Sequence, residues 1–353
     1  RRTGANRRER PWDARTMRYV IIGAGAIGGT IGGRLFQGGH DVVLVARGEH
    51  HRALRDAGLR LVTPQGTHTL RIPVVSAPGE LRLTPDDVLV LCVKTQDTPA
   101  ALDAWAYAPV EGGGTAAERL PVVCAQNAVE NERLALRRFA RVYGMCVWLP
   151  ATHLEPGVVV AYGTPLSGMF HIGRYPHGLD EVARRIAADL SRNAFAAYPE
   201  EQVMRWKYAK LLTNLLNAYD AVCGDPAGAE KIRGLLRAEG AAVLDAAGIP
   251  YASEEEQRAR RGDRVNVAEI PGVPGNRSSS WQSLARRSGS IEADYLNGEI
   301  SLLGRLHGVP TPANDVLHRL ANEFARDRRP PGSLPLPDLI AAIDAAAAET
   351  RPG

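Results

Sequence analysis

Arg18-Tyr-Val-Ile-Ile-Gly-Ala-Gly-Ala-Ile-Gly-Gly29 is the stretch that decides the fold of this chain of 353 residues. It begins with a short apolar run rich in β-branched residues, which predicts a buried strand. The run passes into Gly23-x-Gly25-x-x-Gly28 and then into a predicted helix that extends to about Gln37. Strand, glycine turn and helix in that order predict a nucleotide-binding unit, and a second apolar run at 41–46 supplies the next strand.

Each glycine of this turn has its own physical reason. Gly23 makes the turn, Gly25 lets the backbone approach a pyrophosphate, and Gly28 lets helix and strand pack closely. The anion binds the free N–H groups at the start of the helix, where Ala26 and Ile27 lie. We therefore expect a nicotinamide or flavin dinucleotide here. A glycine turn of an ordinary α/β fold is the alternative.

The residue that follows the second strand bears on which nucleotide binds. Folds specific for NAD usually carry Asp or Glu there, which binds the ribose hydroxyls. This chain has Arg47, whose guanidinium pairs with a 2′-phosphate that a carboxylate would repel. The cofactor prediction is therefore NADP(H). A surface arginine is the alternative interpretation of Arg47.

The composition is that of a globular protein long enough for two domains, with 44% hydrophobic and 23% charged residues. The net charge of +4 is spread along the chain, which predicts no nucleic-acid partner, and no apolar run is long enough for a membrane span. Four cysteines without paired spacing predict a reducing, cytoplasmic setting, and the nine histidines have no metal-ligand spacing. Residues 1–16 are polar and basic and are expected to be a disordered extension.

The periodicity divides the chain into two halves. Residues 17–199 alternate predicted strands and helices, with a hairpin at 59–75, and are expected to form a Rossmann-like NADP-binding domain. Residues 200–330 are expected to form a helical substrate and catalytic domain, and residues 331–353 a linker and a terminal helix. The fold prediction is thus an α/β Rossmann-type domain followed by an all-α domain, with the active site in the cleft between them.

Lysine is rare, because only four of the 43 Lys and Arg residues are lysines. A retained lysine is a functional candidate, since it can donate a proton near neutral pH whereas arginine cannot. In a helix predicted over 200–222, Asn214 and Asn217 lie within about 40° of Lys210, and apolar residues fill most of the remaining circumference. This polar strip predicts a ligand cleft, and a narrow solvated face is the alternative.

A helix predicted over 290–307 gives the complementary signal. Glu292 lies in the middle of its apolar arc, where a carboxylate needs a partner. Glu299 lies about 20° away on the same arc, so the angle alone does not choose between them. A glutamate that meets a structural arginine at the margin of the core is the alternative.

Three further positions complete the candidate site. Lys94 and Asn127 follow predicted strands and are expected at the edge of the sheet where ligands bind. Ser280 ends the run Ser278-Ser279-Ser280 before a predicted helix, where helix capping is the alternative to a ligand contact.

Together these residues resemble the ketopantoate reductase family in order, type and spacing. The resemblance runs over nearly all of residues 17–327. It rests on Gly-Ala-Gly-Ala-Ile-Gly at 23–28, Arg47, Val93-Lys94, Gln126-Asn127, Lys210-x-x-x-Asn214, Ser280, Glu292-Ala-Asp-Tyr-Leu-Asn-Gly298 and His307-Gly-Val-Pro-Thr-Pro-Ala-Asn314.

The resemblance implies an NADPH-dependent reduction of 2-dehydropantoate to pantoate, a step of pantothenate and coenzyme A biosynthesis. It implies Lys210 as general acid and Glu292 as the substrate-binding partner that orients it. It places Ser280 and Asn214 on the polar groups of the substrate, Asn127 between nicotinamide and substrate, and Lys94 in the cofactor cleft. The polar strip beside Lys210 adds Asn217 to the predicted substrate-binding residues.

Three departures bear on the substrate. Ala128 follows Asn127 where the family has glycine, Asn217 follows Lys210 by seven residues rather than eight, and Arg277 stands where some members have an asparagine. The same chemistry on another 2-oxo acid or an imine is therefore the first alternative. A non-catalytic NADP(H) sensor is the second, against which the retention of Lys210 and Glu292 argues. The sequence does not decide the oligomeric state, and a homodimer is one alternative.

Overall fold

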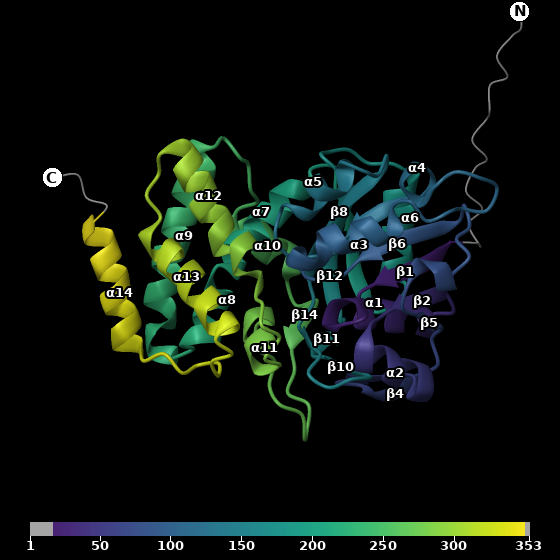
Figure 1. Ribbon diagram of the computed structural model, residues 1–353, viewed down its shortest axis with the longest axis horizontal. Coiled ribbons are helices and arrows are strands. Elements are labelled where there is room, and N and C mark those ends of the chain that lie inside the picture. The colour runs from purple at the N-terminus through teal and green to yellow at the C-terminus, as the bar shows by residue number, and fades with distance from the viewer. Residues whose placement is uncertain (1–16, 350–353) are drawn as a thin grey trace, which may run out of the picture.

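The central sheet is built around the glycine-turn unit (Figure 1). In the computed structural model, which describes residues 17–349, β1 (Arg18–Ile22) leads into α1 (Ala26–Gln37) and pairs in parallel with β2 (Asp41–Val45) and β6 (Asp87–Leu91). Tyr19 and Ile21 of β1 join one apolar cluster, whereas Val20 and Ile22 join another. The sheet therefore separates two cores, as the alternation of side chains along a fully buried strand requires.

The complete sheet has eight strands in the order β13-β12-β8-β7-β6-β1-β2-β5. Every pairing is parallel except that of β12 with β8, so the α/β prediction is confirmed with one antiparallel step. Its other strands are β5 (Val74–Val75), β7 (Val122–Cys124), β8 (Val142–Trp148), β12 (Gly168–Arg174) and β13 (Phe195–Pro199). The helices of this half are α2 (Gly48–Ala57), α3 (Thr98–Trp105), α4 (Ala116–Arg119), α5 (Asn131–Leu136) and α6 (Glu181–Ser191), with short 3-10 turns at Pro78–Glu80 and Thr95–Asp97.

Two small sheets lie beside the central one. The predicted hairpin is present as β3 (Leu59–Thr63) and β4 (Gly66–Leu70), and β9 (Ala151–Thr152) and β10 (Val158–Ala161) extend it. The second sheet pairs β11 (Gly163–Pro165) with β14 (Val265–Val267), which the sequence analysis does not predict. Because β14 comes from the later part of the chain, this pairing ties the helical half to the α/β half.

Beyond β13 the chain is mainly helical, as predicted. The helices are α7 (Val203–Asn214), α8 (Leu216–Val222), α9 (Pro226–Ala246), α10 (Glu254–Arg261), α11 (Ser279–Ala285), α12 (Asn297–His307), α13 (Pro312–Arg326) and α14 (Leu336–Glu349), with the 3-10 turn η3 (Glu292–Tyr295). Leu339 and Ile343 of α14 belong to the apolar cluster of this half, so the terminal helix packs on it beside α13 (Figure 1). The predicted extension 1–16 and residues 350–353 lie outside the described residues. Within 17–349, no helix combines the length and apolarity that crossing a bilayer needs.

Two helices that the sequence predicts as continuous are broken, so those predictions are wrong in detail. The helix expected over 200–222 is interrupted at Leu215, whose carbonyl oxygen accepts a hydrogen bond from Asn297 Nδ2 at 3.0 Å. The helix expected over 290–307 is interrupted at Leu296, where φ is −112° and ψ is −93°. A tertiary hydrogen bond accompanies the first break, and helical periodicity predicts neither break.

Candidate active site

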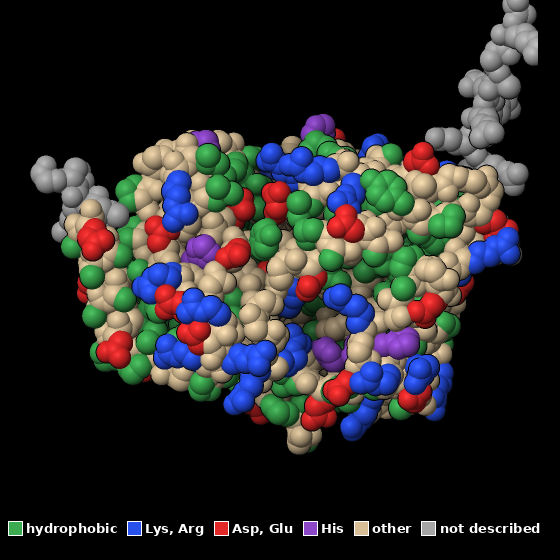
Figure 2. Space-filling view, viewed as in Figure 1, with side chains coloured by type: hydrophobic (Ala, Val, Ile, Leu, Met, Phe, Trp, Pro, Cys, Tyr) green, Lys and Arg blue, Asp and Glu red, His purple; other side chains and the backbone are tan. Residues whose placement is uncertain are grey.

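A cavity of about 800 Å³ lies between the two halves, at the carboxyl ends of β1, β2, β6 and β7. Figure 2 shows a hollow in this face of the molecule with Lys, Arg and His side chains at its margin. The cavity brings together most of the residues that the sequence singles out: Gly23, Gly25, Ala26, Ile27, Arg47, Lys94, Asn127, Lys210, Asn214, Asn217 and Glu292. Residues from Gly23 to Glu292, from both halves of the chain, therefore meet at one site.

Two candidate residues do not line the cavity. A Cβ on Gly28 would lie 2.0 Å from the carbonyl oxygen of Gly23, so this glycine serves the packing of α1 against β1. Ser280 is buried away from the cavity, which Ser278 and Ser279 line instead. Ser278 is also the N-cap of α11, since its Oγ accepts a hydrogen bond from the Trp281 N–H at 3.2 Å.

The glycine turn has the geometry of a phosphate cradle. Gly23 has a φ of +102°, which favours glycine, and a Cβ on Gly25 would meet only His153, at 3.8 Å. The open space beside Gly25 leaves the first N–H groups of α1 accessible, and the first turn of α1 carries no acidic residue. These observations fit the pyrophosphate of a dinucleotide.

Arg47 is the N-cap residue of α2, directly after β2. Its side chain is exposed, and within residues 17–349 its guanidinium has no ion-pair partner. It lines the same cavity as the glycine turn, so an unpaired cation stands where the sequence analysis expects a 2′-phosphate.

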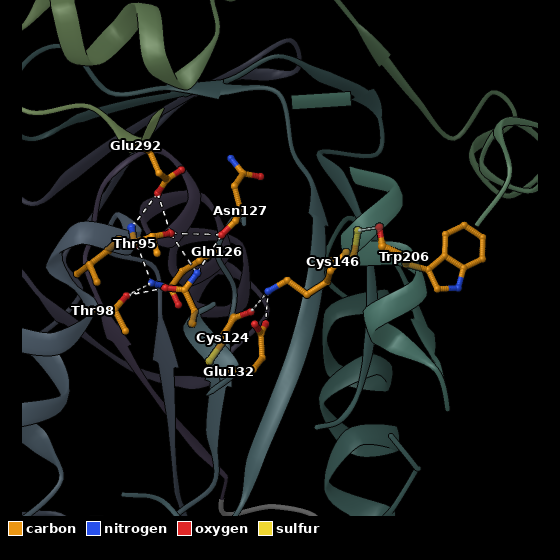
Figure 3. Close-up of polar contacts among 12 residues, drawn as sticks. Thr95, Thr98, Cys124, Gln126, Asn127, Glu132, Cys146, Trp206 and Glu292 are labelled. Carbon is orange, nitrogen blue, oxygen red and sulfur yellow. Dashed lines mark hydrogen bonds and ion pairs between the residues drawn. The ribbon is translucent and has the colours of Figure 1, made fainter. Parts of the chain in front are cut away.

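Glu292 is held by the α/β half although it belongs to the helical half (Figure 3). Its Oε2 accepts hydrogen bonds from the backbone N–H of Thr95 at 2.8 Å and from Thr95 Oγ1 at 3.2 Å. Its Oε1 is buried and has no partner. The described contacts of Glu292 therefore run to Thr95 and not to Lys210, and one carboxylate oxygen is left to accept from a ligand.

A buried polar network supports this arrangement, and the sequence analysis missed most of it. Gln126 Nε2 donates to Val93 O and to Thr98 Oγ1, both at 2.8 Å, and Thr98 Oγ1 donates to Asn131 Oδ1 at 2.7 Å. Asn131 Nδ2 in turn donates to the carbonyl oxygen of Asn127 at 2.9 Å. The loops after β6 and β7 are thereby fixed to each other. Polar residues directly after two predicted apolar strands were the only feature of the sequence that indicated this network.

Lys94 also connects the halves. Its Nζ donates a hydrogen bond to Ser279 Oγ at the start of α11. Burial lowers the pKa of Lys94, the charge of Glu292 opposes this shift, and the charge of Arg286 adds to it. The ammonium thus lies near both a carboxylate and a guanidinium of the helical half.

Lys210 presents an ammonium to the cavity without a carboxylate partner among the described residues. Its Nζ lies 3.9 Å from the ring centroid of Trp148, in cation–π geometry. Burial lowers the pKa of Lys210 to about 8, and the charge of Arg261, which also lies over Trp148, contributes to that lowering. An ammonium with this pKa can give up its proton near neutral pH.

Two amides continue the polar strip beyond Lys210. Asn214 is only 5% exposed, and its Nδ2 is buried without a hydrogen-bond partner. Asn217 lies one turn further and also lines the cavity. The break at Leu215 therefore leaves the predicted strip intact, and the strip offers donors to an anionic ligand.

The structure distinguishes Glu292 from Glu299, which the helical angle alone did not separate. Glu299 lies on α12 and does not line the cavity. Burial, with repulsion from Glu130, raises the pKa of Glu299 to about 7. Glu292, by contrast, faces the cavity.

The three departures also have structural counterparts. Ala128 has a φ of +69°, in the left-handed region where glycine is favoured. Asn217 reaches the cavity despite its different spacing. Arg277 lines the cavity, donates to Asp220 Oδ1 at 2.6 Å and stacks over Trp281.

Comparisons with known proteins give a consistent result. The family model described as ketopantoate reductase PanE/ApbA matches residues 19–177, and its C-terminal counterpart matches residues 202–325. A 2-dehydropantoate 2-reductase of Pyrococcus horikoshii is 27% identical over 323 residues, which is 86% of this chain and 96% of that protein.

Two solved structures share the fold. A PanE/ApbA family ketopantoate reductase from Ralstonia eutropha JMP134 has a TM-score of 0.71 and 28% identity, over 89% of this chain and 100% of that one. The ternary structure of D-mandelate dehydrogenase with NADH and anilino(oxo)acetate has a TM-score of 0.72 and 23% identity, over 88% of this chain and 99% of that one.

Proposed function

This chain belongs to the ketopantoate reductase PanE/ApbA family and is an oxidoreductase acting on a 2-oxo acid, and from this we propose that it reduces 2-dehydropantoate to pantoate with NADPH. Such a reaction would serve pantothenate and coenzyme A biosynthesis, in a cytoplasmic setting. The observation that carries the proposal is the ammonium of Lys210, which has no carboxylate partner within residues 17–349 and a pKa lowered to about 8, in the same cavity as the glycine turn.

The chemistry needs one hydride and one proton. Reduced nicotinamide, when bound, supplies the hydride to C2 of the oxo acid. Lys210 holds the proton for the oxygen on which negative charge grows, and becomes a neutral amine when that oxygen becomes a hydroxyl. Before the proton moves, the Lys210 ammonium also stabilises the negative charge on the substrate oxygen, because the low dielectric of the cavity strengthens the attraction between them.

The remaining residues bind and orient. We assign Asn214 and Asn217 to the oxygens of the substrate, since both amides line the cavity beside Lys210. We assign Asn127, which lines the cavity at the strand end, to the space between nicotinamide and substrate, and Glu292 Oε1 to a hydroxyl of the bound ligand. The substrate contact of Ser280 stays a prediction of the family resemblance, because Ser278 and Ser279 are the serines that line the cavity.

For the cofactor, we propose that Arg47 binds the 2′-phosphate. Arg47→Asp should lower kcat/KM for NADPH by about 10–100-fold and raise the preference for NADH, because a charge-assisted pair becomes a repulsion. Arg52→Asp is the matched control, since Arg52 lies exposed on α2 and does not line the cavity. An unchanged NADPH/NADH ratio in Arg47→Asp would contradict this assignment.

The substrate is tested by NADPH consumption with purified protein. We expect turnover with 2-dehydropantoate that exceeds turnover with unbranched 2-oxo acids. Turnover with another 2-oxo acid or an imine, but not with 2-dehydropantoate, would favour the first alternative, for which Arg277 in the cavity is the motivating observation. Tight NADPH binding without any turnover would favour a sensor.

A further inference from the structure

The wall of the cavity beside the glycine turn contains two histidines that carry no charge. His50 Nδ1 accepts the Gly157 N–H at 2.9 Å, so its Nε2 carries the proton and donates to the carbonyl oxygen of Ala24 at 2.7 Å. The ring of His153 lies 4.2 Å from that of His50 and its Nδ1 contacts Val158 O at 2.9 Å. Burial lowers the pKa of His50 and lowers that of His153 to about 4. These imidazoles shape the turn and supply no cation.

A cation reaches this wall from the other half of the molecule. Arg286 is the C-cap residue directly after α11, and its guanidinium donates to the carbonyl oxygen of His153 at 2.7 Å. The side chain lines the cavity, and within residues 17–349 it forms no ion pair. Its charge acts on Lys94, His50 and His153 together, as a secondary cause of the lowering that burial gives to their pKa values.

The position of Arg286 relates it to the glycine turn and not to Arg47. Arg286 donates to the backbone carbonyl oxygen of His153, and the imidazole of the same residue lies 3.8 Å from where a Cβ on Gly25 would stand. Gly25 is where a pyrophosphate passes the backbone, whereas Arg47 follows β2 at the ribose end. A guanidinium with one N–H group bound to a carbonyl oxygen keeps further donors for an anion.

We propose that Arg286 is the contact of the helical half to the cofactor pyrophosphate, which is thus held between the N–H groups of α1 and a guanidinium from α11. The inference rests on the proposed use of a nicotinamide dinucleotide. Arg286 binds a feature that NADPH and NADH share, whereas Arg47 binds the 2′-phosphate that only NADPH has. Arg286 therefore contributes to the affinity for both nucleotides, and Arg47 contributes to the preference for NADPH over NADH.

The test is a titration of Arg286→Gln with NADPH and with NADH, in which the change in protein fluorescence measures nucleotide binding. Loss of a charge-assisted contact should raise both dissociation constants by a similar factor of about 10–100-fold, and should flatten the salt dependence of binding. Arg287→Gln is the matched control, because it removes the same charge one residue away and Arg287 does not line the cavity. Arg47→Gln should weaken NADPH binding alone.

The outcomes separate this inference from the proposed function. Gln282 Oε1 also accepts from the His153 N–H, at 3.2 Å, so this segment keeps an anchor in Arg286→Gln. If that variant does not fold, Arg286→Lys provides the second test, with weaker binding of both nucleotides expected. Unchanged affinities, or a loss confined to NADPH, would overturn the pyrophosphate assignment. Failure of the unmodified protein to bind either nucleotide would overturn the proposed function itself.

Discussion

Lys207 and Lys210 lie one turn apart on α7 and have opposite environments. Lys207 is buried, donates to Glu132 Oε1 of α5 and lies 3.4 Å from the carbonyl oxygen of Cys124 in β7. Lys210 faces the cavity, where the ring of Trp148 is its nearest described cation–π partner. Lys207 thus fastens the helix to the α/β half, and Lys210, one turn further on, presents an ammonium to the site.

The difference shows that the partner of a buried lysine, and not the residue type, decides whether its ammonium forms a fixed ion pair or has a lowered pKa. Glu132 offsets the cost of burying Lys207, so that pair is a fixed link between the halves. An aromatic ring offsets only part of the cost for Lys210, so the pKa of that ammonium falls. The fixed link also holds α7 in the register that directs Lys210 to the cavity.

The largest expected effect is at Lys210. Lys210→Ala should lower kcat by about 10²–10⁴-fold with little change in NADPH affinity, because the proton donor is lost and the glycine turn is untouched. Lys210→Arg should be similarly slow, since arginine does not give up its proton near neutral pH. Steady-state kinetics and a nucleotide titration measure the two quantities. Near-normal turnover in Lys210→Ala would remove the proposed general acid.

At Lys207 the expected effect is on stability. Lys207→Met leaves Glu132 buried without its partner and should lower the free energy of unfolding by about 3–5 kcal/mol. Denaturant unfolding measures this. Lys231→Met is the control, because Lys231 is exposed on α9, and it should change stability by less than about 0.5 kcal/mol. If Lys207→Met proved as mild as the control, the pair would not be a link between the halves.

The pH dependence of turnover tests the same contrast in the intact enzyme. Burial lowers the pKa of Lys210 to about 8, and only the protonated ammonium donates a proton. The value of kcat should therefore be constant below about pH 8 and fall about tenfold per pH unit above it. Arg261→Gln removes a positive charge that contributes to the lowering, so it should move this break to higher pH. A profile flat to pH 10 would contradict the assignment.

The α/β half was largely predictable because its signals are local. The glycine turn, the apolar strands and the hairpin at 59–75 each specify their own geometry within a few residues. The strip of Lys210, Asn214 and Asn217 was also predictable, since helical angles survive the shallow break at Leu215.

What the sequence could not reveal depends on contacts between distant segments. The roles of Thr95 and Asn131 come from hydrogen bonds between distant segments: Thr95 N–H donates to Glu292, and Asn131 Nδ2 donates to Thr95 Oγ1 across the loops after β6 and β7. Arg286 looked like any other arginine in an arginine-rich chain, and only its contact with His153 places it at the glycine turn. Glu292 likewise belongs to the 3-10 turn η3 and bonds Thr95 of the other half, neither of which the helical periodicity of 290–307 predicts.

The smallest expected effect concerns Ala128, where the α/β half enters the core of the helical half. Its methyl group is buried in the apolar cluster that includes Leu211 of α7, yet its φ of +69° is strained for a residue with a Cβ. Ala128→Gly would relieve about 1–2 kcal/mol of strain, lose about 0.8 kcal/mol of buried methyl and add about 0.5–1 kcal/mol of chain entropy to the unfolded state. The stability should therefore change by less than about 1 kcal/mol.

Ala194 separates these contributions, because its φ is +64° but its side chain is only half-buried. Ala194→Gly relieves similar strain and loses less packing. Its free energy of unfolding should therefore exceed that of Ala128→Gly by up to about 0.8 kcal/mol. Parallel denaturant unfolding of both variants measures the difference. The opposite order would mean that the methyl of Ala128 does not pack against α7, and that the register of α7 rests on the Lys207–Glu132 pair alone.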